Sequence, residues 1–338
     1  MKKFWCILVV GCAFLFLLAA CGSAQPADTG SADGETPEAG SETPEAALSV
    51  YASFYPVYDF AAKIGGEKAR VVNMVPAGTE PHDWEPAAAD IAGLENADVF
   101  VYNGAGMEHW AEDILEALEN KGLIVVEASA GIELMEGHHE HEDEDSEEEA
   151  EHEAAEEEFG HEEEEGYDPH VWLDPQNAKR EMENIKNAFV SADPDNAETY
   201  EANYAKYAAE FDALDDAFRE TLSALPNKDI IVAHEAFGYL CAAYGLNQVP
   251  IEGLSPDSEP DPAKMAEIID FAGEHDVKVV FFEELVSPKV AEAVADAVGA
   301  ETMVLSPIEG LGDEELAAGD DYFSVMRKNL EALKAALQ

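Results

Sequence analysis

Three histidines of this chain stand in positions suited to binding a metal ion. His82 lies in the segment 78–86, His170 lies in 168–175, and His234 begins the segment 234–239. Prolines beside His82 and His170 restrict the backbone and would hold the imidazoles in place. Taken singly, a histidine is more often a packed or surface residue than a ligand. Three of them, in proline-rich or strand-end settings, together predict a metal site.

A carboxylate would complete a set of four ligands around such an ion. Glu309, which follows the last predicted strand, is our choice, and Glu283 and Glu284 compete with it because they also end a strand. Zn²⁺ prefers four tetrahedral nitrogen, oxygen or sulfur ligands, whereas manganese favours more oxygen donors. Three imidazoles and one carboxylate therefore favour zinc, and chemistry alone leaves the fourth ligand open among these three residues.

Short β-rich runs alternate with helical patterns in two parts of the chain. Strands are expected at 48–53, 70–75, 98–102 and 123–127, and again at 229–233, 278–282 and 302–305. Helices are expected at 58–64, 86–95 and 107–120, and again at 262–274, 288–298 and 322–337. Such alternation indicates parallel sheets built from right-handed βαβ units. His82 and His234 follow strand ends, where open α/β sheets bind their ligands.

The segment 176–225 is almost entirely helical in character and separates the two alternating parts, 48–175 and 226–338. Asp193-Pro194 starts its second half. The apolar stripe of that half is Tyr200, Tyr204, Tyr207, Phe211, Leu214 and Phe218. This three- and four-residue spacing packs one face of a long helix. We expect a stiff helical connector between two lobes.

The chain has a net charge of −56, which should attract cations and argues against binding to nucleic acid. Much of the charge falls in the insertion 137–166, which is expected to be disordered. Five of the ten histidines gather there: His138, His139, His141, His152 and His161. Tracts rich in histidine suggest accessory metal capture, and a merely solvated acidic insertion is the alternative.

The N-terminus predicts export and a lipid anchor. Residues 1–20 combine two lysines, an apolar run and small residues, as a secretory signal does. Cys21 follows Leu-Ala-Ala and resembles the lipidated cysteine of bacterial lipoproteins, so it is the expected lipidation site. The Gly-, Ser- and Pro-rich segment 21–47 is expected to be a disordered tether. Only Cys241 then remains, and one thiol forms no internal disulfide.

Six segments together resemble the metal-specific substrate-binding proteins of bacterial ABC transporters, in particular their zinc-uptake branch. They are 76–86, 103–108, 168–175, 234–239, 253–262 and 282–289. The resemblance runs from about residue 48 to the C-terminus. It implies the fold class α/β, with two Rossmann-like lobes of parallel sheets joined by a single long α-helix and a metal ion in the cleft.

The resemblance also implies ligands at His82, His170, His234 and Glu309. In the manganese branch the third position is usually a carboxylate, so His234 favours zinc. The implied protein is not an enzyme. It is a lipid-anchored protein on the outer face of the cell membrane that captures Zn²⁺ as transported ligand and delivers it to an ABC permease. We expect a monomer that binds no nucleic acid.

Three alternatives remain beside zinc transport. A manganese-transport binding protein is the nearest, and a zinc-dependent hydrolase or a surface adhesin would belong to other classes. No His-Glu-x-x-His motif occurs in the sequence, and four protein ligands would close the water position that a catalytic zinc keeps open. Adhesion would not require the histidine set.

Overall fold

The computed structural model describes residues 47–137, 166–256 and 262–338. All of them belong to one compact unit, Ala46–Gln338. The expected signal peptide 1–20, the tether except for Ala47, and the five clustered histidines lie outside the described residues. In the part of the chain that is described, no helix combines the length and the apolar character needed to cross a bilayer.

The first lobe is built on a four-stranded parallel sheet in the order β2-β1-β3-β4. Its strands are β1 (Leu48–Ala52), β2 (Ala69–Asn73), β3 (Val99–Tyr102) and β4 (Ile124–Glu127). Its helices are α1 (Tyr55–Gly65), α2 (Ala88–Leu94) and α3 (Ala111–Ala117), with a short 3₁₀ turn η1 (Gly66–Lys68). Parallel strands need crossover helices, and these helices supply them on both faces of the sheet.

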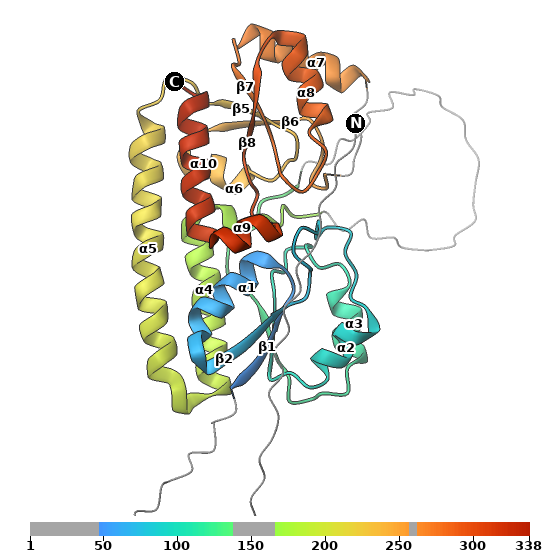
Figure 1. Cartoon of the computed structure of the whole chain (residues 1–338), viewed down its shortest axis with the longest axis vertical. Helices are drawn as coiled ribbons and strands as arrows, with labels where there is room; N and C mark the ends of the chain where they lie inside the picture. Colours follow the sequence, from blue (N-terminus) through green and yellow to red (C-terminus); the bar gives the residue numbers. More distant parts are fainter. Residues whose placement is uncertain (1–46, 138–165, 257–261) are drawn as a thin grey trace, which may run out of the picture. The chain divides into compact units, whose positions relative to one another are not determined.

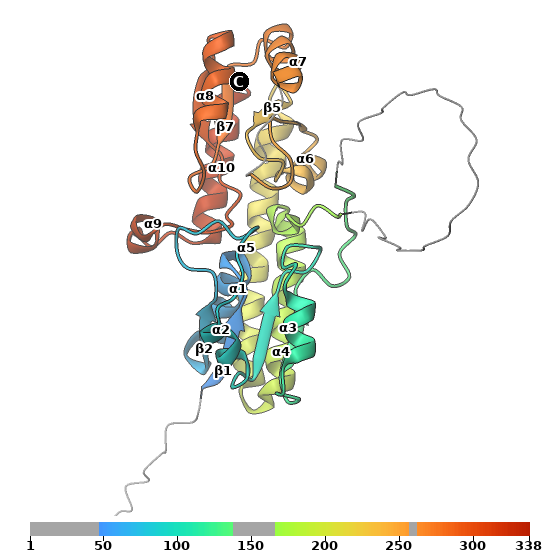
Figure 2. The same cartoon turned by 90° about the vertical axis from the view of Figure 1, so that its right-hand side faces the viewer.

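The second lobe repeats this plan with the strand order β6-β5-β7-β8, again all parallel. Its strands are β5 (Asp229–Val232), β6 (Asn247–Pro250), β7 (Val279–Phe282) and β8 (Glu301–Val304). Its helices are α6 (Gly238–Tyr244), α7 (Pro262–Glu274), α8 (Lys289–Val298) and α9 (Asp313–Ala318). Figures 1 and 2 show the second lobe in orange at one end of the compact unit and the first lobe in blue and teal at the other.

Residues of one strand alternate between two cores, because successive side chains point to opposite faces of a sheet. In β3, Val99 and Val101 enter the large core under α1, whereas Phe100 packs with the residues of α2 and α3. In β7, Phe281 enters the large core and Val280 packs against α7 and α8. Both sheets are therefore covered on both faces, which explains their continuous apolar strands.

A helical layer runs along both lobes and joins them (Figure 1). It consists of α4 (Pro175–Ala192), α5 (Ala197–Ser223) and α10 (Tyr322–Ala336), with the 3₁₀ turn η3 (Pro194–Asn196) between the first two. The 27-residue α5 contacts α1 of the first lobe and α6 of the second. Its ring Phe211 packs against Phe60 and Phe323. This arrangement confirms the predicted fold class, two parallel α/β lobes joined by one long helix.

Three elements of the second lobe were not predicted from the sequence. They are α6, α9 and the edge strand β6, whose sequence Asn-Gln-Val-Pro carries polar residues and a proline. Among the described strands, β6 pairs with β5 alone, and an edge strand tolerates a proline that a central strand would not. The predicted helices 86–95 and 107–120 are shorter in the structure, where α2 and α3 have seven residues each.

Candidate metal centre

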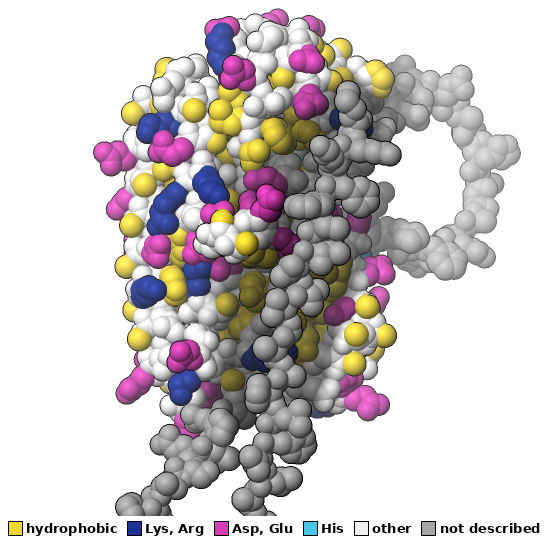
Figure 3. All heavy atoms as spheres, viewed as in Figure 1, with side chains coloured by type: hydrophobic (Ala, Val, Ile, Leu, Met, Phe, Trp, Pro, Cys, Tyr) yellow, Lys and Arg dark blue, Asp and Glu magenta, His cyan; other side chains and the backbone are white. Residues whose placement is uncertain are grey.

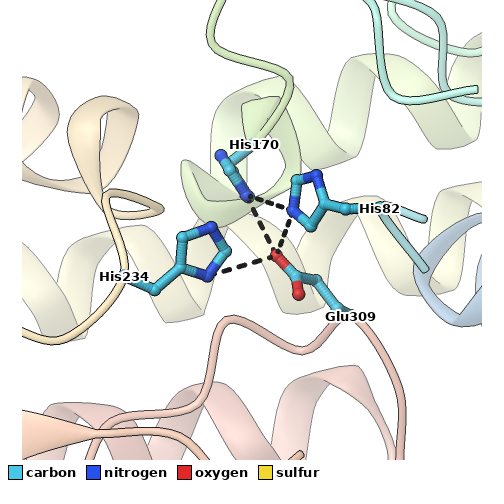
Figure 4. Close-up of side chains that lie close together, drawn as sticks. All are labelled: His82, His170, His234 and Glu309. Atoms are coloured by element: carbon cyan, nitrogen blue, oxygen red, sulfur yellow. Dashed lines mark hydrogen bonds and ion pairs between the residues drawn. The ribbon is translucent and has the colours of Figure 1, made fainter. Parts of the chain in front are cut away.

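His82 lies in the loop between β2 and α2, beyond the carboxyl end of β2. Its backbone N–H donates to both carboxylate oxygens of Glu80, at 2.9 and 3.1 Å. This local turn, together with Pro81, fixes the backbone of the histidine. The His82 side chain is 11% exposed, so it is the one member of the site that solvent reaches most easily. Its Nε2 atom points toward the other ligands (Figure 4).

His170 is fully buried and precedes the 3₁₀ turn η2 (Val171–Leu173). One oxygen of Asp168, Oδ1, accepts hydrogen bonds from the His170 backbone N–H at 2.9 Å and from its ring Nδ1 at 2.8 Å. Since Nδ1 then carries the proton in the neutral ring, Nε2 presents its lone pair to the site. The indole of Trp172 donates to the carbonyl of Pro307 at 2.7 Å and thereby ties this loop to the one that carries Glu309.

His234 follows β5 and is also buried. Its Nε2 lies 2.8 Å from the carbonyl oxygen of Leu254. A carbonyl only accepts hydrogen bonds, so Nε2 carries the hydrogen and the ring faces the site with Nδ1. This nitrogen has no hydrogen-bond partner among the described residues. His234 is thus oriented to bind a metal through Nδ1, and the other two histidines through Nε2.

Glu309 lies in the loop between β8 and α9 and is 1% exposed. Its Oε1 atom is 2.9 Å from His170 Nε2, 3.3 Å from His82 Nε2 and 3.8 Å from His234 Nδ1. Figure 4 shows the three rings converging on this one oxygen. Its other oxygen, Oε2, has no hydrogen-bond partner in the described part of the chain.

The four ligand atoms fit a zinc ion. They all lie within 4.8 Å of one another, and they form the group of potential metal ligands found among the described residues. Metal–ligand distances of about 2.0–2.1 Å in a tetrahedron separate neighbouring ligand atoms by roughly 3.3–3.4 Å. The observed separations between Glu309 Oε1 and the three ring nitrogens, 2.9 to 3.8 Å, bracket this value. Small side-chain shifts suffice to admit the ion.

Glu283 and Glu284, the competing carboxylates from the sequence, lie outside this group. Glu284 is exposed. Glu283 is buried, and its Oε1 lies 3.2 Å from His234 Nδ1, but neither atom has a hydrogen-bond partner, so the contact lacks hydrogen-bond alignment. The structure therefore brings Glu309, and not Glu283 or Glu284, together with all three histidines.

The metal-free cluster balances its charges internally. Burial alone would raise the pKa of Glu309, but the charges of His234 and His82 outweigh burial and hold it well below its usual value. Burial would lower the pKa of His170, but its hydrogen bonds to Asp168 and Glu309 raise it to about 10. The pKa of His234 is raised in the same sense, since the charge of Glu309 outweighs its burial. An ion that binds both histidines must therefore compete with protons.

Sequence reasoning missed two residues that position the ligands. Glu80 and Asp168 each stand two places before a ligand histidine and accept its backbone N–H. Both belong to an acid-Pro-His triplet, which was the available signal. The predicted accessory histidines and the lipidation site Cys21 lie outside the described residues.

The chain has two parallel α/β lobes, and their facing loops bring three imidazoles and one carboxylate together. This arrangement defines a class, the two-lobed binding proteins with a metal-ligand cluster between the lobes. Within this class the chain belongs to the ZnuA family. Residues 50–336 match the family described as zinc-uptake complex component A, periplasmic. This result confirms the family to which the sequence motifs pointed.

Individual relatives agree with this assignment. The high-affinity zinc uptake system protein ZnuA of Bacillus subtilis is 43% identical over 338 residues, which are 100% of this chain and 99% of the relative. The zinc-binding lipoprotein AdcA of Streptococcus pneumoniae is 39% identical over 99% of this chain, which spans only 61% of AdcA. The Zn(II)-bound ZnuA-like domain of AdcA has a TM-score of 0.71 and 36% identity, covering 86% of this chain and 99% of that one.

Proposed function

We propose that this chain captures Zn²⁺ outside the cytoplasm with His82, His170, His234 and Glu309, and delivers the ion to an ABC permease. The observation that carries the proposal is the meeting of these four ligand atoms within 4.8 Å of one another. Their chemistry, three imidazoles and one carboxylate, is typical of zinc. The zinc-uptake family to which the chain belongs supports the transport role. Zinc is then the cargo, and the chain is a binding protein and not an enzyme.

The proposal includes attachment to the outer face of the cell membrane. Residues 1–20 would be removed as a signal peptide, Cys21 would carry the lipid, and 21–47 would be the tether. Several acyl chains anchor a protein stably, whereas one chain binds only marginally. The lipoprotein AdcA, which matches 99% of this chain, supports this reading. Beyond the tether we divide the chain into lobes 48–175 and 226–338 and the connector 176–225.

The His-rich insertion would act as an accessory that raises the local zinc concentration. Its flanks are held together, since the N–H of Gly137 donates to the carbonyl of Gly166 at 2.8 Å and Glu136 bridges to Tyr167. Residues 138–165 can therefore be excised and replaced by a short turn. None of the four ligands lies in this segment, so its contribution can be measured by deleting it.

Calorimetric titration of the full chain in detergent with Zn²⁺ and with Mn²⁺ tests the proposal. We expect one tight zinc site, much weaker manganese binding, and a tight site that survives deletion of 138–165. His234→Ala should abolish tight binding, and the surface variant His275→Ala should not. His275 is a matched control because its ring bonds to Asp229, away from the cluster.

Three outcomes would contradict the proposal. In one outcome, tight zinc binding disappears with the insertion but persists in His82→Ala and His170→Ala. The protein would then bind zinc through the insertion on its surface and not through the four-ligand site. Manganese binding as tight as zinc binding would favour the manganese-transport alternative. An exchangeable water on the bound metal would instead support a zinc hydrolase, because a catalytic zinc keeps one open position.

A further inference from the structure

A mostly apolar groove of about 190 Å³ opens beside the metal centre. Its walls include Tyr55, Tyr58, Val75, Pro76, Leu311 and Leu316. Glu309 and Gly310 also line it, so the groove reaches the loop that supplies the carboxylate ligand. We call it the seam groove, because one wall belongs to the first lobe and the other to the second.

The seam groove separates two loops that each carry a ligand. Val75 and Pro76 of its first wall lead into the His82 loop, and the residues of its second wall continue from Glu309. One backbone hydrogen bond spans the seam, from the N–H of Gly78 to the carbonyl of Leu311 at 3.1 Å. An object inserted between these walls would push the two loops apart and lengthen the 3.3 Å separation between His82 Nε2 and Glu309 Oε1.

The backbone beside Glu309 is strained. Ile308 has a φ of 61°, in the left-handed region, which is a genuine outlier for a β-branched side chain. Strain of this kind persists only where the surrounding structure enforces it, and it collects at switch regions. The contacts that enforce it include the bond from Trp172 to Pro307. A change in those surroundings would let the Glu309 loop relax away from the histidines.

The rim of the groove indicates the chemistry of what would enter it. Leu316 is 40% exposed, one of three large apolar side chains of the described residues with such exposure. It stands in α9, which also carries the acidic residues Asp313, Glu314 and Glu315. The His82 loop, which continues from Val75 and Pro76 of the first wall, carries the acidic residues Glu80, Asp83 and Glu85, and neither segment contains a lysine or an arginine. Figure 3 shows acidic side chains close to α9, near the middle of the view.

We propose that the seam groove receives an apolar side chain from a basic loop of the ABC permease, and that this insertion separates His82 from Glu309 and releases the ion. The acidic rim complements a basic partner, and the apolar walls complement the inserted side chain. The inference rests on the proposed transport function. It adds the surface, the chemistry of the partner and the step by which a buried ion leaves a closed site.

The test replaces the gene copy in the source cells with variants of the full chain and measures uptake of ⁶⁵Zn²⁺. Leu316→Lys removes the apolar contact and adds a charge of the same sign as the partner, whereas Leu316→Met keeps the contact. Val125→Lys is the matched control, because Val125 is 43% exposed on β4. Zinc affinity of each purified full chain is measured in parallel and also reports whether the variant is folded.

We expect Leu316→Lys to bind zinc within about twofold of wild type and to lower uptake at least about fivefold, as loss of an interface contact does. Leu316→Met and Val125→Lys should support normal uptake. Normal uptake with Leu316→Lys would overturn the inference and leave the transport function standing. Loss of zinc affinity in Leu316→Lys would also overturn it, since the groove would then belong to the metal site. A wild-type chain that binds zinc but restores no uptake would overturn both.

Discussion

Asp168 holds His170 by two hydrogen bonds to a single oxygen, one from the backbone N–H at 2.9 Å and one from ring Nδ1 at 2.8 Å. The second bond fixes the ring as the tautomer that offers Nε2 to the metal. Glu80 repeats the first bond with His82, again from two residues upstream. The same acid-Pro-His triplet therefore presents two of the three imidazoles, and the outer carboxylate is part of the site although it binds no metal itself.

Asp168→Asn should weaken zinc binding about 10–100-fold, the usual effect of losing an outer partner of a metal-binding histidine. The amide can present its nitrogen to Nδ1, and either tautomer of His170 then becomes accessible. Competition with a chromophoric zinc chelator measures the affinity. Asp212→Asn is the control, because Asp212 is an exposed partner of Lys179. Unchanged affinity in Asp168→Asn would show that the His170 ring needs no such support.

Zinc binding at pH 7.5 should release protons to the buffer. The pKa of His170 in the metal-free protein is raised to about 10, since its hydrogen bonds to Asp168 and Glu309 outweigh burial. The ring is therefore protonated at pH 7.5, and ligation must remove that proton. Zinc affinity should rise about tenfold per pH unit for each proton released. The share of this rise that comes from deprotonation of His170 should end as the pH passes about 10.

Titration calorimetry in Tris and in phosphate at one pH checks this release, because the two buffers differ in the heat of taking up a proton. The difference between the apparent binding enthalpies gives the number of protons. Equal enthalpies in both buffers would mean that the imidazoles are already neutral before zinc arrives. Glu309 does not add to the release, since the charges of His234 and His82 hold its pKa well below the normal value.

Glu309→Gln should reduce zinc affinity by more than the roughly 10–100-fold expected for an outer-shell residue. Among the described residues, it removes the one carboxylate that lies with all three ring nitrogens. Glu284→Gln should change little, because Glu284 is exposed. The loss of zinc affinity in Glu283→Gln should lie between the losses in these two variants, since Glu283 Oε1 is 3.2 Å from His234 Nδ1. The same chelator competition ranks the three variants, and a larger loss for Glu283→Gln than for Glu309→Gln would reassign the fourth ligand.

The parallel lobes and the histidine set could be predicted from the sequence because both leave local patterns. Continuous apolar runs mark strands that are covered on both faces, as in β3 and β5. Strand β6 left no such pattern, because an edge strand with one neighbour needs few apolar residues. Glu80 and Asp168 did leave a pattern, the repeated triplet, but its meaning depends on hydrogen bonds that spacing alone does not reveal.

The orientation of His234 had no local signal at all. It depends on the carbonyl of Leu254, twenty residues away, and that carbonyl reaches the ring only after β6 and the following loop are in place. The choice among the three glutamates was open for the same reason. Glu283 follows β7 directly, whereas Glu309 lies in the loop after β8, directly after the left-handed backbone of Ile308.

Glu181→Met should stabilise the protein. Glu181 lies on the buried face of α4, is 0% exposed, and neither carboxylate oxygen has a hydrogen-bond partner among the described residues. Its neighbour Glu108, by contrast, accepts hydrogen bonds from Ser53 and from two backbone N–H groups. Removing a buried polar group that lacks a partner relieves about 1–3 kcal/mol, and methionine has a similar length and no charge.

The gain should depend on pH. Burial raises the pKa of Glu181 well above 4.5, helped by the charge of Glu108, so the folded protein keeps this proton after the unfolded chain has lost it. Glu181 therefore costs stability progressively as the pH rises above about 4.5, until the folded group ionises. Thermal melts should show a larger gain for Glu181→Met at pH 8 than at pH 5. The control is Glu183→Met, because Glu183 pairs with Arg180 on the other side of α4. Its free energy of unfolding should stay within about 0.5 kcal/mol of wild type. An equal gain in both variants would mean that methionine stabilises the helix through its propensity and not by removing the buried carboxylate.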